Sequence, residues 1–184
     1  PSPVDNKGEV RDDKIFKTSY WKYYAKKLKG NDFSEESITN IQKTSRQILS
    51  YERDNDYEAN DIVKGLVIGF VQSGKTANYT GLVSMAADNG YQLIIVLAGV
   101  MTNLRDQTYN RLKDELNFDF TDLSQRERIP QINMIEPGNL RYNATRTTPL
   151  DMSLTNVAVV LKNSSRLIKL KEWLDYQVAD HSNN

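Results

Sequence analysis

The sequence contains no cysteine and a single histidine, His181. The lack of thiols excludes disulfides and thiolate zinc sites. One histidine near the end of the chain also argues against a histidine-based metal centre or catalytic triad. Any chemistry must therefore rest on lysine, threonine, arginine, acidic residues and backbone groups.

An excess of charge and a long apolar run are missing as well. The 24 Lys and Arg residues balance 24 Asp and Glu residues, so net charge argues neither for nor against a nucleic-acid partner. The longest apolar run, Leu93 to Met101, is too short to span a bilayer, and the polar residues 1–14 lack a signal-peptide core. We therefore expect a cytoplasmic protein with no membrane partner.

The chain of 184 residues is long enough for one domain with a peripheral part. Residues 1–13 are charged and unpatterned, and are predicted to form a loose arm. Residues 14–60 are predicted to form a helical appendage, and residues 61–184 the main domain. The chain opens on Pro1 and ends on a polar stretch, and we expect it to be a piece of a longer protein.

Two helices are expected in the appendage. Residues 17–29 carry aromatic residues and lysines at helical spacing; we favour packed aromatics and solvated lysines over a basic surface for nucleic acid. In residues 31–52, Asp32 and Glu35 have the spacing of a capping box. Four apolar residues recur on one face of this second helix: Ile38, Ile41, Ile48 and Leu49.

The main domain alternates strands and helices. Buried strands are expected at residues 64–70, 91–99, 131–135 and 156–162. The first two enclose a helix that ends at Asn89-Gly90. A second helix should begin at Thr102 or Asn103 and present the apolar stripe Leu104, Thr108, Leu112 and Leu116. A third should be capped by Ser164 or Ser165 and bury Leu167, Leu170, Leu174 and Val178. This order predicts an α/β fold with a mostly parallel sheet flanked by helices.

The segment Gly69–Thr76, "GFVQSGKT", matches every fixed position of the phosphate-binding pattern G-x-x-x-x-G-K-[ST]. A chance match in a chain of this length is on the order of one in two hundred. The segment leaves a predicted strand and enters a predicted helix, where backbone N–H groups and the positive end of the helix can cradle phosphates. The sequence therefore predicts a site for ATP. Its predicted binding residues are Gly69, Gln72, Ser73, Gly74, Lys75 and Thr76.

Each polar residue of this segment has an expected task. Lys75 would bridge the outer phosphates, and the Thr76 hydroxyl would ligate Mg²⁺, which prefers oxygen ligands. Gln72 would contact the terminal phosphate or position water, or else cap the loop. The alternative is a simple turn in which Gly74 supplies a positive φ and Lys75 is solvated. Gly81, further along the helix, is expected to be a close-packing position rather than a ligand contact.

The phrases "VQSGKTANYTGL" and "LAGVMTNLRDQT" resemble the start of the ATPase core in the Z-one domain family, large bacterial and viral proteins described as endonucleases. "VAVVLKNSSRLIKLKEWL" is similar to a later block of that family, although Leu161 stands where a lysine is expected. The resemblance covers roughly residues 34–178. It implies a RecA-like NTPase lobe related to superfamily-two helicases, acting on DNA in restriction or phage defence.

The resemblance also implies a nucleic-acid contact after the second strand, at Asn103, Arg105 and Gln107. From spacing alone, a capped amphipathic helix with a solvated arginine is slightly favoured. Two parts are missing: an acidic partner for Mg²⁺ and attacking water, and clustered carboxylates for a nuclease centre. Asp151 and Lys162 flank a predicted strand without a Glu-x-Lys pair.

The family's acidic box would follow the block that ends near Trp173, so we expect little or no ATP turnover by these residues alone. Two other classes remain open. One is a small-molecule kinase or phosphotransferase, in which residues 136–155 would form a lid over the acceptor site. The other is a scaffold that retains the loop without hydrolysing nucleotide.

Overall fold

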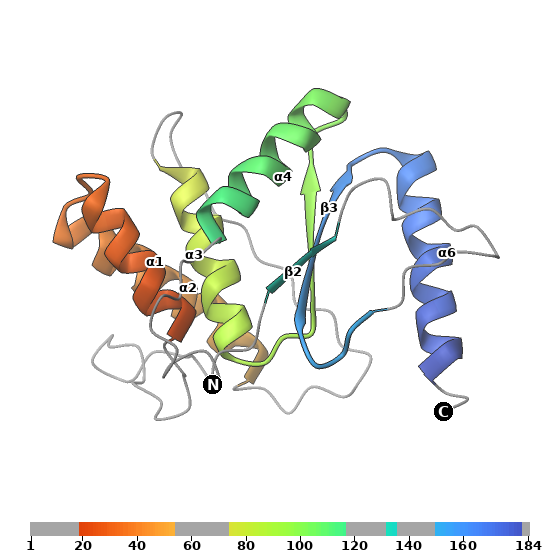
Figure 1. The fold of residues 1–184 in the computed structure, drawn as a ribbon, viewed down its shortest axis with the longest axis horizontal. Coiled ribbons are helices and arrows are strands. Elements are labelled where there is room, and N and C mark those ends of the chain that lie inside the picture. Colours follow the sequence, from red (N-terminus) through yellow and green to blue (C-terminus); the bar gives the residue numbers. More distant parts are fainter. Residues whose placement is uncertain (1–18, 54–73, 117–131, 136–149, 182–184) are drawn as a thin grey trace. The chain divides into compact units, whose positions relative to one another are not determined.

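The computed structural model describes residues 19–53, 74–116, 132–135 and 150–181. They belong to two compact units, residues 1–89 and residues 90–184, which we call the helical unit and the sheet unit. The predicted domain limits at residues 13 and 60 and the predicted strand at 64–70 lie outside the described residues. The helical unit contains α1, α2 and α3, and the sheet unit contains β1, α4, β2, β3 and α6 (Figure 1).

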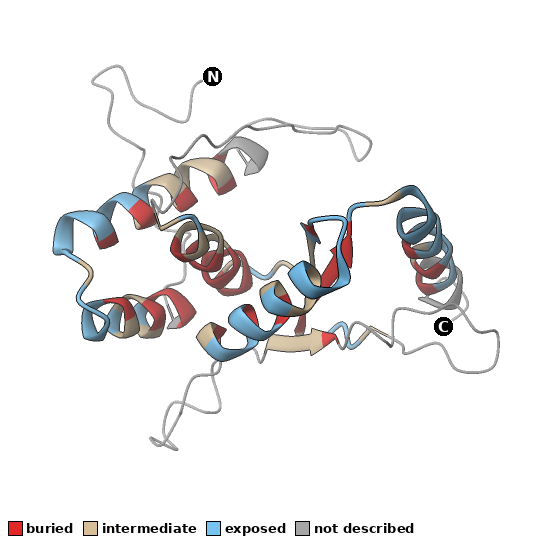
Figure 2. Ribbon diagram, turned by 90° about the horizontal axis from the view of Figure 1, so that it is seen from above, coloured by how far each residue is buried: buried red, intermediate tan, exposed pale blue. Residues whose placement is uncertain are grey.

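In the helical unit, α3 (Lys75–Asp88) packs against α1 (Ser19–Gly30) and α2 (Glu35–Arg53). The helices come close at Gly81, where an added Cβ would lie 2.6 Å from Ile41 Cγ2 and 3.2 Å from Trp21 Cζ3. The prediction that Gly81 is a packing position is therefore confirmed. Tyr20, Trp21 and Tyr24 of α1 are buried, as expected for packed aromatics (Figure 2).

A buried carboxylate joins the end of α3 to the start of α1. Asp88, the last residue of α3, is 3% exposed and accepts hydrogen bonds from the N–H groups of Tyr20 (2.7 Å) and Trp21 (2.9 Å). These N–H groups lie in the first turn of α1, where no preceding turn supplies a carbonyl. Asp88 therefore caps a helix that is distant from it in the sequence. As predicted, α3 then ends at Asn89-Gly90, where Gly90 has φ 81°.

The predicted capping box of α2 is wrong. Asp32 adopts a left-handed conformation, with φ 61°, in the turn after α1. The cap is Ser34, whose Oγ accepts a hydrogen bond from Ser37 N–H at 3.1 Å. Glu35 accepts instead from Lys29 Nζ across the turn, and this exposed contact raises the pKa of Lys29.

The sheet unit is a three-stranded parallel sheet in the order β1-β3-β2, made of Leu93–Ala98, Thr155–Leu161 and Ile132–Ile135. Ile95 pairs with Ala158 on one side of β3, and Ile135 with Ala158 on the other. Helices α4 (Thr102–Leu116) and α6 (Ser164–His181) flank the sheet (Figure 1). The predicted α/β fold with a parallel sheet is thus confirmed for the described strands. No described helix is long and apolar enough to cross a membrane.

The middle strand, β3, is the core of this unit, since every one of its residues is buried. Because side chains alternate along a strand, Ala158 and Val160 share one face, and they cluster with Ile135, Leu170 and Trp173. At the other end of β3, the buried Asn156 side chain donates to three backbone carbonyls, those of Gln92, Asp151 and Leu154. By contrast, β1 was predicted to be buried but is mostly half-buried.

The two flanking helices differ in detail from expectation. In α6 the cap is Asn163, not Ser164 or Ser165, because Asn163 Oδ1 accepts from Arg166 N–H at 3.0 Å. Its buried residues are Leu170, Trp173 and Gln177, whereas Leu167 is 37% exposed and the Val178 side chain is not described. Helix α4 begins at Thr102 as predicted and buries Tyr109, Leu112 and Leu116, but Leu104 is 44% exposed.

Candidate functional site

The predicted phosphate-binding segment is described from Gly74 onward; Gly69, Gln72 and Ser73 lie outside the described residues. Gly74 directly precedes α3 with φ 71° and ψ 25°, a left-handed conformation that favours glycine. A glycine has no side chain with which to cap the helix. Gly74 therefore gives the first-turn N–H groups of α3 no side-chain acceptor. These N–H groups point away from the helix along its axis.

Lys75 and Thr76 occupy the first turn of α3 in different surroundings. Lys75 is exposed, Thr76 is half-buried, and Ala77 behind them is buried. The Thr76 hydroxyl is an oxygen donor of the kind that Mg²⁺ accepts, with the remaining ligands supplied by phosphates and water. An exposed Lys75 behind a left-handed Gly74 fits both a phosphate site and a solvated turn. What distinguishes the two is the full sequence pattern.

A cavity of about 460 Å³ opens beside Gly74 within the helical unit. Its walls come from the N-terminal half of α2, the turn before it and the start of α3. The described lining residues are Phe33, Ser37, Asn40, Ile41, Thr44, Gly74 and Asn78. Asn78 is held in place because its N–H and its Nδ2 both donate to the Gly74 carbonyl, at 3.1 and 3.3 Å.

The predicted nucleic-acid residues lie on different faces of α4. Asn103 and Gln107 are one helical turn apart and both are exposed. Arg105 is rotated by about half a turn from them. Its side chain is 17% exposed and donates from Nε and Nη2 to Asp106 Oδ1, at 2.8 and 2.6 Å. The helix therefore does not direct all three residues to a single contact.

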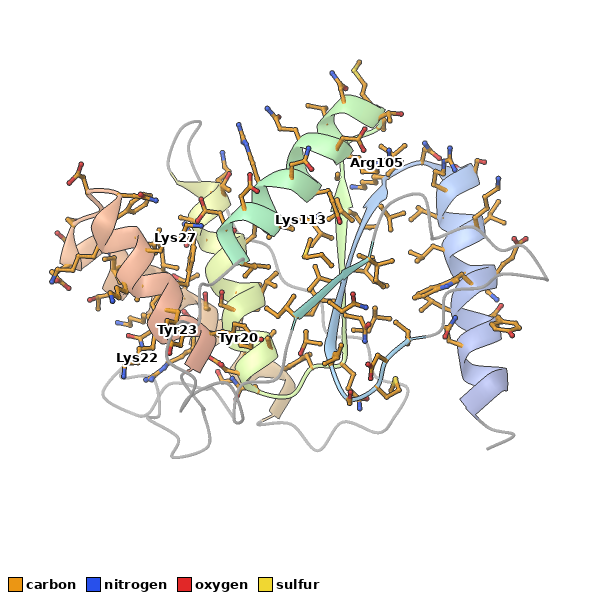
Figure 3. All side chains as sticks on the ribbon, viewed as in Figure 1. Tyr20, Lys22, Tyr23, Lys27, Arg105 and Lys113 are labelled. Carbon is orange, nitrogen blue, oxygen red and sulfur yellow. The ribbon has the colours of Figure 1, made fainter. Side chains whose placement is uncertain are left out.

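Instead, Arg105 lies beside the carboxyl end of β3 (Figure 3). It lines a small depression together with residues 159–161 of β3 and two basic residues of α6, Arg166 and Lys169. The ends of β1 and β3 are joined here, since Lys162 N–H donates to the Ala98 carbonyl at 3.1 Å. We call Arg105, Arg166 and Lys169 the basic cluster.

Most of these residues could not be predicted from the sequence. The basic spacing of Arg166 and Lys169 on one helix was a usable signal, but nothing in the sequence placed them near Arg105. The lining residues of α2 carried no signal, because their proximity to Gly74 depends on the packing of two separate helices.

In the helical unit, the N–H groups at the start of α3 can accept an anion. In the sheet unit, the basic cluster forms a positively charged depression. Within the described part of the chain, no group of three His, Cys, Asp or Glu residues could hold a metal ion. Among the described residues, Thr76 is the one at the start of α3 whose hydroxyl could join a ligand's own oxygens around a metal ion. No family model, no curated protein and no solved structure matches this chain.

Proposed function

We propose that the chain binds ATP and Mg²⁺ through Gly69–Thr76, as the first RecA-like lobe of a DNA-acting, helicase-like ATPase associated with endonuclease activity. One observation carries the proposal: Gly69–Thr76 matches every fixed position of G-x-x-x-x-G-K-[ST], and a left-handed Gly74 opens α3 immediately before the Lys75-Thr76 pair of that pattern. The α/β fold with a parallel sheet is compatible with such a lobe, and the family resemblance suggests which kind of ATPase it is.

In this proposal the start of α3 holds the phosphates. Its first-turn N–H groups, for which Gly74 supplies no side-chain cap, and the positive end of the helix dipole favour a polyanion. Lys75 supplies a positive charge from the exposed side of the first turn, and Thr76 supplies an oxygen for Mg²⁺. Such preorganised groups bind well because little reorganisation accompanies ligand entry.

Calorimetric titration of the full chain with MgATP tests this proposal. A lost charge-assisted contact of about 1.5–3 kcal/mol corresponds to roughly ten- to a hundredfold weaker binding, which we expect for Lys75→Ala. Lys43→Ala, which removes another exposed lysine in the same unit, serves as the control and should bind like the wild type. Equal affinities for wild type and Lys75→Ala, or no MgATP binding by the wild type, would refute the proposal.

We expect this chain to hydrolyse ATP slowly or not at all, because its sequence has no recognisable apolar strand that ends in an acidic partner for water. A phosphate-release assay with MgATP checks this expectation. Substantial turnover that disappears in Lys75→Ala would show that these residues already contain a complete catalytic site.

DNA is the proposed partner of the basic cluster. Its three cations line a depression at the carboxyl end of β3. Basic side chains of this kind position proteins on DNA by contacting the phosphates of its backbone. Asn103 and Gln107, on the opposite and exposed face of α4, are not part of this contact. Fluorescence anisotropy with a labelled DNA duplex at several salt concentrations tests this part.

We expect Arg166→Ala to weaken DNA binding and lower the salt dependence by about one counterion. Lys171→Ala is the matched control, since Lys171 lies on the same helix but is exposed and paired with Asp175. If Arg166→Ala and Lys171→Ala both weaken DNA binding, or if neither does, the basic cluster is not the DNA contact.

A further inference from the structure

The cavity beside Gly74 carries an inference that rests on the proposed function and extends it. We infer that this cavity receives the nucleoside part of the nucleotide, so that the N-terminal helical appendage forms the base-binding half of the ATP site. The phosphates would lie at the start of α3, and the base and ribose between α2 and α3.

The described lining is suited to a neutral, partly aromatic group. Phe33 and Ile41 offer apolar surface, while Asn40 and Thr44 offer amide and hydroxyl groups that can pair with base edges or ribose hydroxyls. No described lining residue carries a formal charge, so the cavity itself is not suited to a phosphate. The volume of about 460 Å³ falls in the range of small-molecule sites, roughly 300–1,000 Å³.

The position of Gly74 links the two parts of the ligand. Gly74 lines the cavity and also lies in the phosphate-binding segment directly before α3, so a neutral cavity continues into an anion-accepting helix start. Phe33 Cε1 lies 3.7 Å from the point that a Cβ on Gly74 would occupy, which places an aromatic ring at this junction. A compound with an aromatic neutral part joined to a polyphosphate has this shape and charge distribution.

The geometry also gives the appendage a task. Helix α2 precedes the phosphate-binding segment, and without it the cavity would lose the wall formed by Ser37, Asn40, Ile41 and Thr44. Selectivity for the nucleoside would then come from α2, and affinity for the phosphates from α3.

Blocking the cavity without touching the phosphate site tests the inference. Asn40 is exposed on α2, so Asn40→Trp can fill the cavity with little effect on folding. Thr39→Trp places the same ring at the adjacent exposed position, which does not line the cavity, and serves as the matched control. Each variant of the full chain is titrated with MgATP and with magnesium tripolyphosphate, after circular dichroism has verified its fold.

We expect Asn40→Trp to weaken MgATP binding at least about tenfold, as for a ligand denied its pocket, and to leave tripolyphosphate binding unchanged. Thr39→Trp should leave both unchanged. The smaller change Thr44→Val, which removes one hydroxyl, should weaken ATP binding by about two- to tenfold and spare tripolyphosphate.

Failure of the inference can be told from failure of the proposed function. If wild type binds both ligands but Asn40→Trp and Thr44→Val bind ATP normally, the cavity does not hold the nucleoside and the phosphate site stands. Loss of both ligands in Asn40→Trp also overturns the inference. If wild type binds neither ligand, the proposed function fails, and the nucleoside site fails with it.

Discussion

The packing inside the helical unit differs from the packing inside the sheet unit. In the helical unit, a few specific contacts determine the packing: a glycine that admits two neighbours at Gly81, and a buried Asp88 carboxylate that caps α1. In the sheet unit, an entirely buried β3 packs aliphatic side chains around Trp173. Stability should therefore depend on apolar volume in the sheet unit and on individual atoms in the helical unit.

The chain offers a built-in way to follow each unit. It contains two tryptophans, Trp21 in the helical unit and Trp173 in the sheet unit, and both are buried. Fluorescence of a variant that retains one of them reports on one unit.

Trp173→Ala should have the largest effect, because it leaves a cavity in the cluster between α6 and β3. We expect a loss of about 3–5 kcal/mol in the free energy of unfolding, measured by urea denaturation followed by circular dichroism. Trp173→Phe is the control. It keeps most of the volume and removes a buried Nε1 that has no partner among the described residues, so its loss should be below about 1.5 kcal/mol. If Trp173→Ala and Trp173→Phe lose the same free energy of unfolding, the buried volume of this side chain does not determine stability.

Asp88→Ala should destabilise the helical unit by about 2–4 kcal/mol, because two first-turn N–H groups of α1 would lose their acceptor. Urea denaturation followed by Trp21 fluorescence, in a Trp173→Phe background, measures the effect. Asp88→Asn keeps one acceptor oxygen and should cost less. The comparison of units fails if Trp173 fluorescence, followed in a Trp21→Phe background, shifts as much as that of Trp21.

Gly81→Ala should cost about 1–2 kcal/mol, since overpacking against Ile41 exceeds the gain in helix propensity of about 1 kcal/mol. Gly30→Ala is the matched control, because a Cβ at Gly30 would meet nothing within 4 Å. Thermal unfolding of both variants measures the difference. A Gly81→Ala protein as stable as Gly30→Ala would show that α2 and α3 can move apart freely.

Asp151 should give the smallest effect, since its carboxylate is solvent-exposed. The hydroxyl and then the backbone N–H of Ser153 donate to it and lower its pKa below the ordinary value of 3.8. Its stabilising contribution is therefore present above that unfolded-state value and is lost as pH falls through the lower folded pKa. Titration of the Asp151 carboxyl by NMR checks the direction, and a folded pKa at or above 3.8 would contradict it.

Local patterns in the sequence predicted most described elements. The end of α3 at Asn89-Gly90 and the start of α4 at Thr102 were predictable, because the residues that stop or start a helix lie at that position in the sequence. Strand β3 was recognisable from its unbroken apolar run. The same reasoning failed for the buried face of α6, where Trp173 rather than Leu167 is buried, because a helix with apolar residues on several sides does not reveal which side meets the sheet.

Contacts between distant segments could not be predicted. Nothing local indicates that Asp88 caps α1, that Ile41 faces Gly81, or that Arg105 shares a depression with α6. For the candidate site, the phosphate-binding pattern predicted Lys75 and Thr76, while the cavity residues of α2 emerged only from helix packing. Asp32 was assigned as a cap because its spacing to Glu35 was right; the chain turns there instead, and Ser34 takes that place.

Ile41 couples the cavity to the packing of α2 on α3. The same side chain lies against Gly81 and lines the cavity, so a group that fills the cavity also contacts the α2–α3 packing. By mass action, a ligand at a hundred times its dissociation constant adds about 2.7 kcal/mol to the stability of the folded state that binds it. In the proposed function, nucleotide in this cavity would add to the stability of the α2–α3 packing within the helical unit.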